Sequence, residues 1–216
     1  MTEIDLFFYM FGLISLILIL MIIFILNKSR NIANWLFIMT PALFTLILIF
    51  NMINYYGDII NDFLLWFPYL LAPLGMLLSS IYILRGPGFH KNTYLQLSIG
   101  LYVLLSILFS SYPKPLEYSQ MSNAQQGLMH LYLIIPFIVT IYCFKKIASE
   151  IPEQKQKIYF LITGLILVCL GSLARSIEYI VYNQDSTIGM VIIVVGSILT
   201  LLAFAGVGQH KAEQTN

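Results

Sequence analysis

Long apolar runs separated by short polar gaps make up almost all of this chain. The seven runs cover about residues 6–26, 34–55, 63–84, 94–111, 128–145, 158–182 and 187–207. A helix needs about 20 apolar residues to cross a hydrocarbon layer of ~30 Å. The pattern therefore predicts an all-α membrane protein, a seven-transmembrane-helix bundle that forms a single domain over residues 1–216. We expect the first run to be a retained helix, because an acidic pentapeptide precedes it where a signal peptide would have a basic leader.

Basic residues lie almost entirely in alternate gaps, which predicts how the helices are oriented. Of the 11 Lys and Arg residues, nine occupy the first, third and fifth gaps and the tail: Lys28, Arg30, Arg85, Lys91, Lys145, Lys146, Lys155, Lys157 and Lys211. The other gaps contain only Lys114 and are acidic, with Asp58, Asp62, Glu117 and Asp185. Because basic residues accumulate in short cytoplasmic loops, we expect the amino terminus outside and the carboxyl terminus in the cytoplasm, in a multi-pass protein of the plasma membrane.

Composition excludes several classes of partner. Hydrophobic residues make up 59% of the chain and charged residues 10%, against roughly 25% charged in an ordinary soluble domain. The formal net charge of +1 provides no basic field for a nucleic acid. The expected surroundings are the lipid bilayer, and nucleic acid is not an expected partner.

An ionisable pair inside the sixth run is the most unusual chemical feature. Arg175 and Glu178 are three residues apart, so a helix places them on one face. Charged side chains within a membrane usually face the bundle interior and pair there. Small residues continue this face and recur in the last run, so we expect these two helices to pack closely. The four glycines expected at this contact are Gly164, Gly171, Gly189 and Gly196.

Six polar residues are expected at a similar depth in the outer third of the bundle, counting 1.5 Å of rise per residue. They are the ligand-binding candidates Arg175, Glu178, His130, Asn51, Asn54 and Tyr69. Together they could line a pocket in which a guanidinium and a carboxylate orient a small polar ligand. Alternatively, Arg175 and Glu178 neutralise each other and hold their helix in register. The sequence leaves both interpretations open.

Four prolines lie inside apolar runs and predict helix kinks: Pro41, Pro68, Pro73 and Pro136. Each proline removes a backbone donor and leaves the carbonyl four residues earlier without its helical partner. In most bundles such kinks bend a helix around its neighbours. In transporters, the freed carbonyls coordinate ions or permit gating.

No residue pattern in the chain indicates catalysis, a metal or a cofactor. His130 is the only outer histidine, whereas His90 and His210 lie on the cytoplasmic side, so matched ligands for haem or zinc are missing. Cys143 and Cys169 are expected at different depths, too far apart for a disulfide. We find no phosphate-binding loop and no nucleophile motif. We therefore expect a non-enzymatic protein.

The chain resembles the seven-transmembrane sensor modules that precede histidine kinases and diguanylate cyclases in prokaryotes. The resemblance covers nearly the whole chain and is carried by short loops, by the basic-then-Trp segment from Lys28 to Trp35, and by a glycine-studded last run. It implies ligand sensing in the membrane. Those modules continue into an output domain, whereas this sequence continues for only about nine residues after the last run. We therefore expect a sensor of this kind to signal through a separate cytoplasmic partner.

Three functions remain open on the sequence alone. The leading hypothesis is a receptor-like or sensor-like protein that binds a small polar ligand in the outer half of the bundle. The kinked third run and the intramembrane charges favour a small secondary transporter or channel as the alternative. A third possibility is a structural subunit that assembles with other membrane subunits.

Overall fold

Seven α-helices account for nearly all of the described chain. The computed structural model describes residues 3–28, 31–57, 61–111, 123–182 and 187–205, without the side chains of 3–11, 28, 52, 54–57, 62, 123, 187, 204 and 205. The helices are α1 (Glu3–Lys28), α2 (Ile32–Gly57), α3 (Asp62–Arg85), α4 (Thr93–Ser110), α5 (Asn123–Glu150), α6 (Lys155–Ile177) and α7 (Thr187–Ala205). Two 3₁₀ turns, Pro87–Lys91 and Pro152–Gln154, precede α4 and α6, and a π-helical turn, Glu178–Tyr182, extends α6. None of the described residues is in a β-strand.

The helix positions agree with the apolar runs, and the ends differ where polar residues continue a helix. The run predicted over 63–84 is α3, which begins and ends within one residue of the prediction. The run predicted over 128–145 is longer in the structure, because α5 extends at both ends into polar sequence. A helix does not have to stop at the membrane surface, since its backbone bonds are internal.

Asparagines in the polar gaps cap three of the helices. The side-chain oxygen of Asn31 accepts from the Asn34 amide (2.8 Å) at the start of α2. Asn61 accepts from the Phe63 amide (3.0 Å) before α3, and Asn92 does the same for α4. Such caps satisfy amides that a helix start leaves without partners. The gaps therefore carry helix-start signals as well as charges.

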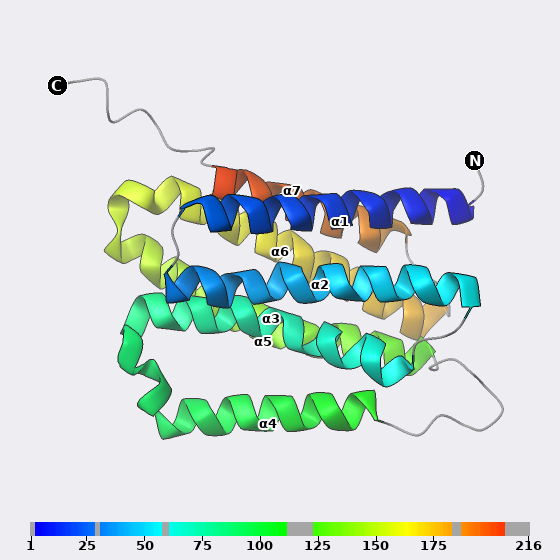
Figure 1. Cartoon of the computed structure of the whole chain (residues 1–216), viewed down its shortest axis with the longest axis horizontal. Helices are drawn as coiled ribbons and strands as arrows, with labels where there is room; N and C mark the ends of the chain where they lie inside the picture. The colour runs from blue at the N-terminus through cyan, green and yellow to red at the C-terminus, as the bar shows by residue number, and fades with distance from the viewer. Residues whose placement is uncertain (1–2, 29–30, 58–60, 112–122, 183–186, 206–216) are drawn as a thin grey trace.

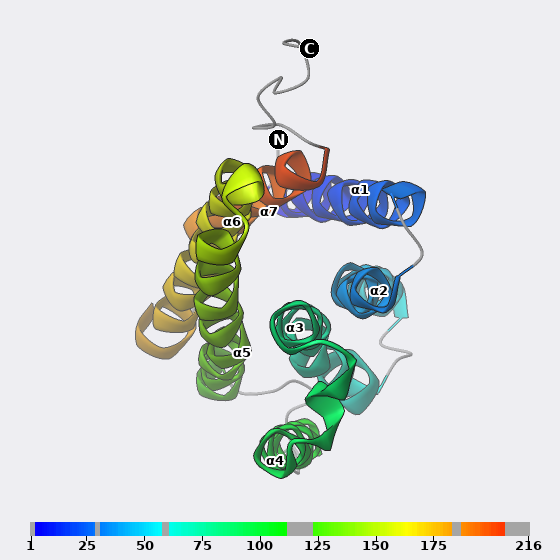
Figure 2. The ribbon, with the colours of Figure 1, turned by 90° about the vertical axis from the view of Figure 1, so that its left-hand side faces the viewer.

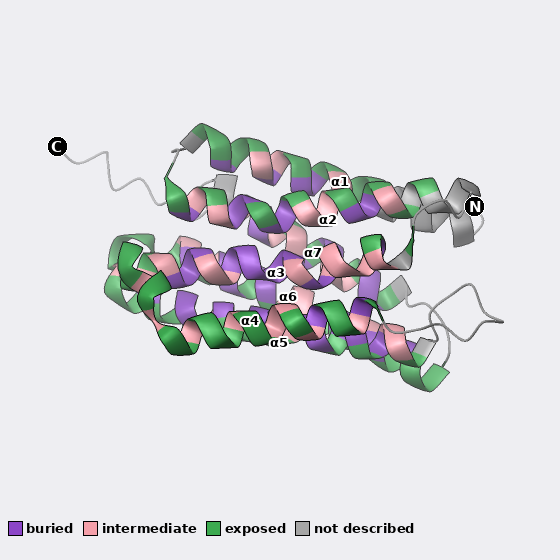
Figure 3. Cartoon of the chain, turned by 60° about the horizontal axis from the view of Figure 1, so that its bottom comes forward, coloured by how far each residue is buried: buried purple, intermediate pink, exposed green. Residues whose placement is uncertain are grey.

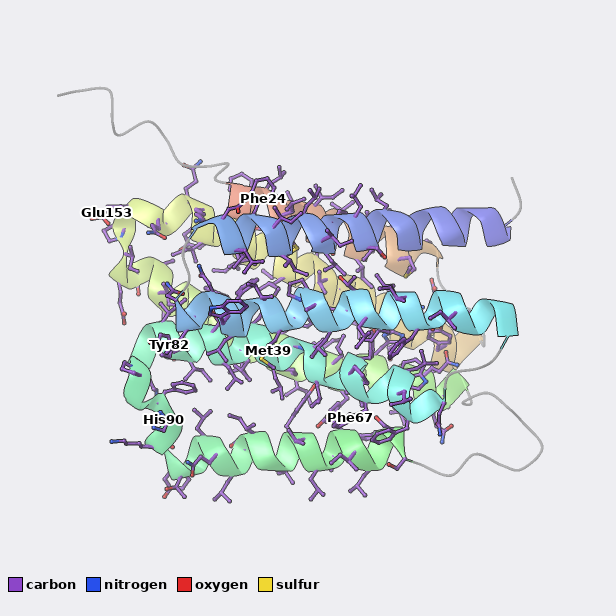
Figure 4. The ribbon with its side chains drawn as sticks, in the orientation of Figure 1. Phe24, Met39, Phe67, Tyr82, His90 and Glu153 are labelled. Carbon is purple, nitrogen blue, oxygen red and sulfur yellow. The ribbon has the colours of Figure 1, made fainter. Side chains whose placement is uncertain are left out.

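Gly86 ends α3 and turns the chain toward α4. Its φ of 71° lies in the left-handed region, which suits a residue without a Cβ. The Gly86 amide donates to the Tyr82 carbonyl (2.8 Å), which closes the last turn of α3. The Tyr82 ring then meets Phe89 of the following 3₁₀ turn edge-on, with centroids 5.8 Å apart. This end of the bundle also carries His90 and Glu153, opposite the end at which Phe67 lies (Figure 4).

Six helices form a closed ring and α4 packs outside it. Going round the ring, α1 contacts α2, α2 contacts α3, α3 contacts α5, α5 contacts α6, α6 contacts α7, and α7 returns to α1. Seen end-on, α4 lies beyond α3 at the edge of the bundle (Figure 2). The helices lie lengthwise along the bundle (Figure 1), with α5 and α6 tilted relative to α2, α3 and α4 (Figure 2). The ring therefore brings α3, α5 and α6 together although α4 separates them in sequence.

The interior of the ring is mostly apolar, and so is much of its outer surface. Met21, Phe37, Phe137 and Leu165 belong to one buried cluster that joins α1, α2, α5 and α6. Large apolar side chains are nevertheless exposed along the helices, and α4 is exposed over most of its surface (Figure 3). Exposed apolar surface on this scale is typical of a protein that faces lipid.

Length and hydropathy support the same conclusion. Five described stretches are long and apolar enough to cross a membrane: Ile32–Asn51, Phe63–Arg85, Thr93–Ser110, Ala124–Glu150 and Pro152–Tyr182. In α1 and α7 the described apolar stretches, Gly12–Asn27 and Ile188–Ala203, are shorter. The chain is an all-helical, multi-pass protein embedded in a membrane.

Candidate functional site

A chain of polar contacts crosses the bundle from α3 through α5 to α6. Tyr69 Oη and His130 Nδ1 share a hydrogen bond of 2.8 Å. On the other side of His130, the Tyr179 ring stacks on the imidazole at 5.6 Å between centroids and an interplanar angle of 8°. Arg175 Nη2 then donates to Tyr179 Oη (3.1 Å). We call Tyr69, His130, Tyr179 and Arg175 the polar cluster.

His130 is the centre of the polar cluster and is only 2% exposed. It lies on the face of α5 that also buries Met129 and Leu133. A buried imidazole needs hydrogen-bond partners, because an unsatisfied polar group in an apolar interior is destabilising. Tyr69 occupies Nδ1. A further polar group can therefore reach the imidazole only through Nε2.

Aromatic rings surround Tyr69 and fix its direction. Trp66, one turn earlier on α3, meets Tyr69 edge-on with centroids 5.6 Å apart. Phe44 of α2 packs against the Tyr69 ring at 5.7 Å. The sequence identified Tyr69 by its depth but did not indicate Trp66 or Phe44. The Trp66–Tyr69 spacing of three residues is the one local signal that could have linked them.

Arg175 faces Tyr179, its neighbour one helical turn later. The guanidinium carbon is 5.6 Å from the centroid of the Tyr179 ring, a distance at which a cation is attracted to an aromatic face. On the α7 side, a Cβ built on Gly189 would approach Arg175 Cγ to 2.5 Å. The arginine stem therefore occupies space that only a glycine leaves on α7.

The contacts that the structure shows for the Arg175 guanidinium go to Tyr179. The ion pair with Glu178 expected from the spacing stays a prediction. Glu178 begins the π-helical turn that ends at Tyr182.

Of the two candidate asparagines on α2, only Asn51 has a described side chain, and the hydrogen bond shown for it goes to its own helix. The Asn51 side chain is exposed and donates to the Ile47 carbonyl (3.0 Å) of its own helix. The Asn54 side chain lies outside the described residues. Of the six candidates, the structure joins Tyr69, His130 and Arg175. It adds Tyr179, which is not among the six candidates.

Gly127 lets α5 approach α6 one turn before His130. A Cβ on Gly127 would lie 3.0 Å from the Ser176 carbonyl and 2.5 Å from Ile180 Cγ1. The Ser176 hydroxyl donates to the Gly127 carbonyl (2.7 Å) across the same contact. This close approach places His130 against Tyr179.

The four glycines predicted for helix packing lie between α6 and α7. A Cβ on Gly164 would come within 2.6 Å of the Gly196 carbonyl, and one on Gly171 within 2.7 Å of the Gly189 carbonyl. Both distances are well below ordinary van der Waals contact. Backbone lies against backbone here, as small residues allow in membranes.

The four prolines expected to kink helices lie inside the three described helices that carry them. Pro41 is in α2, Pro68 and Pro73 are in α3, and Pro136 is in α5. Beside two of them a threonine bonds back along its own helix: Thr45 to the Pro41 carbonyl and Thr140 to the Pro136 carbonyl. Beside Pro73 the hydroxyl belongs to Thr40 of α2, which donates to the Ala72 carbonyl of α3.

A second aromatic contact joins α4 to α3 and α5 beside the polar cluster. Tyr102 of α4 stacks on Tyr132 of α5 with centroids 4.6 Å apart. The Tyr102 hydroxyl donates to the Leu70 carbonyl of α3 (2.6 Å), and the Tyr132 hydroxyl donates to the Tyr102 carbonyl (2.7 Å). These bonds tie the outer helix α4 to the residue that follows Tyr69.

Within the described residues, no group of three or more His, Cys, Asp or Glu side chains is arranged to hold a metal ion. Comparison with protein-family models, curated proteins and solved structures gives no match. Function therefore has to be inferred from the polar cluster and its place in the bundle.

Proposed function

We propose that this protein is a receptor or sensor of the plasma membrane with seven transmembrane helices, which binds a small polar ligand at the polar cluster. Its amino terminus faces outward and its carboxyl terminus inward, as the charges of the gaps indicate. Under this proposal the protein is not an enzyme and passes its signal to a separate cytoplasmic partner or to other membrane subunits.

One observation carries the ligand proposal: a nearly inaccessible histidine connects a tyrosine on α3 to a tyrosine and an arginine on α6. Polar side chains inside a membrane bundle are costly, and they commonly mark ligand or ion sites. Here they converge from three helices that are distant in sequence. A ligand that bonds to His130 Nε2 or to the arginine would change the contacts of all three helices at once.

Ligand binding can be tested by thermal unfolding of the purified protein in detergent. The probes are a panel of small polar compounds: acetate, succinate, phosphate, glycine, glutamate and histamine. We expect at least one probe to raise the Tm of the wild type and of Tyr142→Phe, a matched control because Tyr142 lies on α5 and is 68% exposed. The same probe should not raise the Tm of Tyr179→Phe. Equal responses in both variants, or no response to any probe, would contradict the ligand proposal.

The same probe separates a receptor from a transporter. Uptake of the radiolabelled probe into proteoliposomes, lost in Tyr179→Phe, would favour the transporter. Binding without uptake would favour the receptor. The transporter remains a candidate because α3 contains two prolines. In addition, the hydroxyl of Thr40 from α2 bonds to the α3 backbone between residues 72 and 76.

The orientation can be tested by cysteine labelling in whole cells, in a background that lacks Cys143 and Cys169. Asn61 and Lys91 are exposed and lie in successive gaps at the two ends of α3. We expect a membrane-impermeant maleimide to label Asn61→Cys in intact cells. Lys91→Cys should react only after the membrane is made permeable. The reverse pattern would show that the orientation is wrong.

A further inference from the structure

A threonine of α2 is inserted into the backbone hydrogen bonding of α3. The Thr40 hydroxyl donates to the Ala72 carbonyl (2.6 Å) and accepts from the Met76 amide (2.9 Å). In a regular helix these two backbone groups bond to each other, because they are four residues apart. Thr40 is 1% exposed, so water does not compete for these bonds.

The neighbouring residues weaken α3 at this point and let α2 come close to it. Pro73 has no amide hydrogen, so it cannot donate to the carbonyl four residues earlier as other helical residues do. Gly75 lets α2 approach: a Cβ there would lie 2.6 Å from the Leu36 carbonyl and 2.7 Å from Thr40 Oγ1. The helix is weakened by the proline and held from outside by Thr40.

The segment beyond this point carries the first residue of the polar cluster. Tyr69 lies one turn before Pro73, and its hydroxyl reaches His130. The next carbonyl, that of Leu70, accepts from Tyr102 of α4. Hydroxyl groups of α2 and α4 thus hold the same short stretch of α3 from two sides.

We infer that Thr40 is a positioning residue of the polar cluster. Its hydroxyl bridges the α3 backbone between Ala72 and Met76, a segment at which the helix can bend and which we call the hinge. By holding the hinge, Thr40 keeps Tyr69 in position against His130. Loss of the hydroxyl lets the outer arm of α3 tilt and weakens the Tyr69–His130 bond. The part that this hinge plays in signalling rests on the proposed function. The hinge itself rests only on the contacts of α2 with α3.

Electron–electron distance measurements between spin labels test the hinge without any ligand. The outer pair of labels is at Leu64 and Val191, and the inner pair is at Ile83 and Ile198; all four side chains are exposed. Each pair joins α3 to α7, and the two natural cysteines are replaced by alanine. From Leu64 to the hinge the arm is ~12 Å long, so a tilt of about 20° moves its end by about 4 Å.

In Thr40→Val we expect the outer distance to shift or broaden by about 4 Å, while the inner distance stays unchanged. Thr40→Ser keeps a hydroxyl and should restore the wild-type distances. Thr45→Val is the matched control, because the Thr45 hydroxyl bonds only back to the Pro41 carbonyl of its own helix in the described structure. An outer distance in Thr40→Val equal to that of the wild type would overturn the hinge.

Gly75→Ala provides a second route if Thr40→Val does not fold. The added methyl would push against the Leu36 carbonyl and against Thr40 Oγ1, so it disturbs the same contact of α2 with α3 from the α3 side. The same shift of the outer pair is expected, and an unchanged outer distance would again overturn the proposal.

The link to Tyr69 has its own measurement, the ¹⁵N chemical shifts of the His130 imidazole. Its signal is assigned by comparison with His130→Gln. We expect Thr40→Val to move the Nδ1 shift toward that of Tyr69→Phe, and Thr40→Ser to leave it at the wild-type value. A purely local packing role for Thr40 would leave this shift unchanged, and that result would refute the positioning role even if a probe still binds.

Discussion

Replacing Gly171 by alanine tests the close contact of α6 with α7. The new Cβ would lie 2.7 Å from the Gly189 carbonyl and 2.9 Å from the Ile193 amide. Both are backbone atoms, which cannot turn away as a side chain can. Ordinary contact begins at 3.4 Å, so the two helices have to separate by about 0.7 Å. Overpacking of this kind typically costs ~1–3 kcal/mol of unfolding free energy.

Gly100→Ala is the matched control for this prediction. Gly100 is an exposed glycine inside α4, and nothing lies within 4 Å of its Cβ position. Alanine favours a helix over glycine by up to about 1 kcal/mol, so the control should be neutral or slightly stabilised. Both variants change a helical glycine to alanine, and their difference isolates the contact with α7.

The assay is unfolding by SDS in mixed micelles, followed by circular dichroism and tryptophan fluorescence. We expect Gly171→Ala to unfold at a lower SDS fraction, with a free energy about 1–3 kcal/mol below that of Gly100→Ala. Equal free energies of unfolding for Gly171→Ala and Gly100→Ala would refute the close backbone contact.

Two further predictions concern buried hydroxyl groups. Tyr69→Phe removes the bond to His130 and leaves a buried imidazole nitrogen unsatisfied. It should lower the unfolding free energy by ~1–3 kcal/mol in the same assay. An unfolding free energy equal to that of the wild type would mean that the bond is not formed. Ser176→Ala removes the bond to the Gly127 carbonyl and should cost ~1 kcal/mol, whereas Ser149→Ala, whose hydroxyl bonds an exposed carbonyl of its own helix, should leave the midpoint unchanged.

Helix positions could be predicted because they depend on local properties of the chain. Whether a segment prefers lipid or water is decided by its own side chains, and this is why α3 and α4 begin and end within one residue of the predicted runs. The close packing of α6 against α7 at the predicted glycines also has a local basis, since only small residues let two backbones meet.

The partners of the polar residues could not be predicted in the same way. The i, i+3 spacing related Arg175 to Glu178 and gave no indication of the contact between the guanidinium and Tyr179 that the structure shows. Depth counting placed Asn51 beside His130, but the Asn51 amide bonds its own helix. Spacing along one helix and depth in the membrane do not give the rotation of a helix about its axis. Rotation decides which side chains face each other.

The sequence by itself determined that this protein is a membrane-embedded bundle of apolar helices, because hydrophobic transfer is set residue by residue. Only the tertiary structure decided that six helices form a ring with α4 outside it. It also decided that Tyr69 meets His130, 61 residues away, and that Thr40 enters the hydrogen bonding of α3. These contacts depend on how neighbouring helices rotate and slide against each other, and that is fixed by the packing of all of them at once.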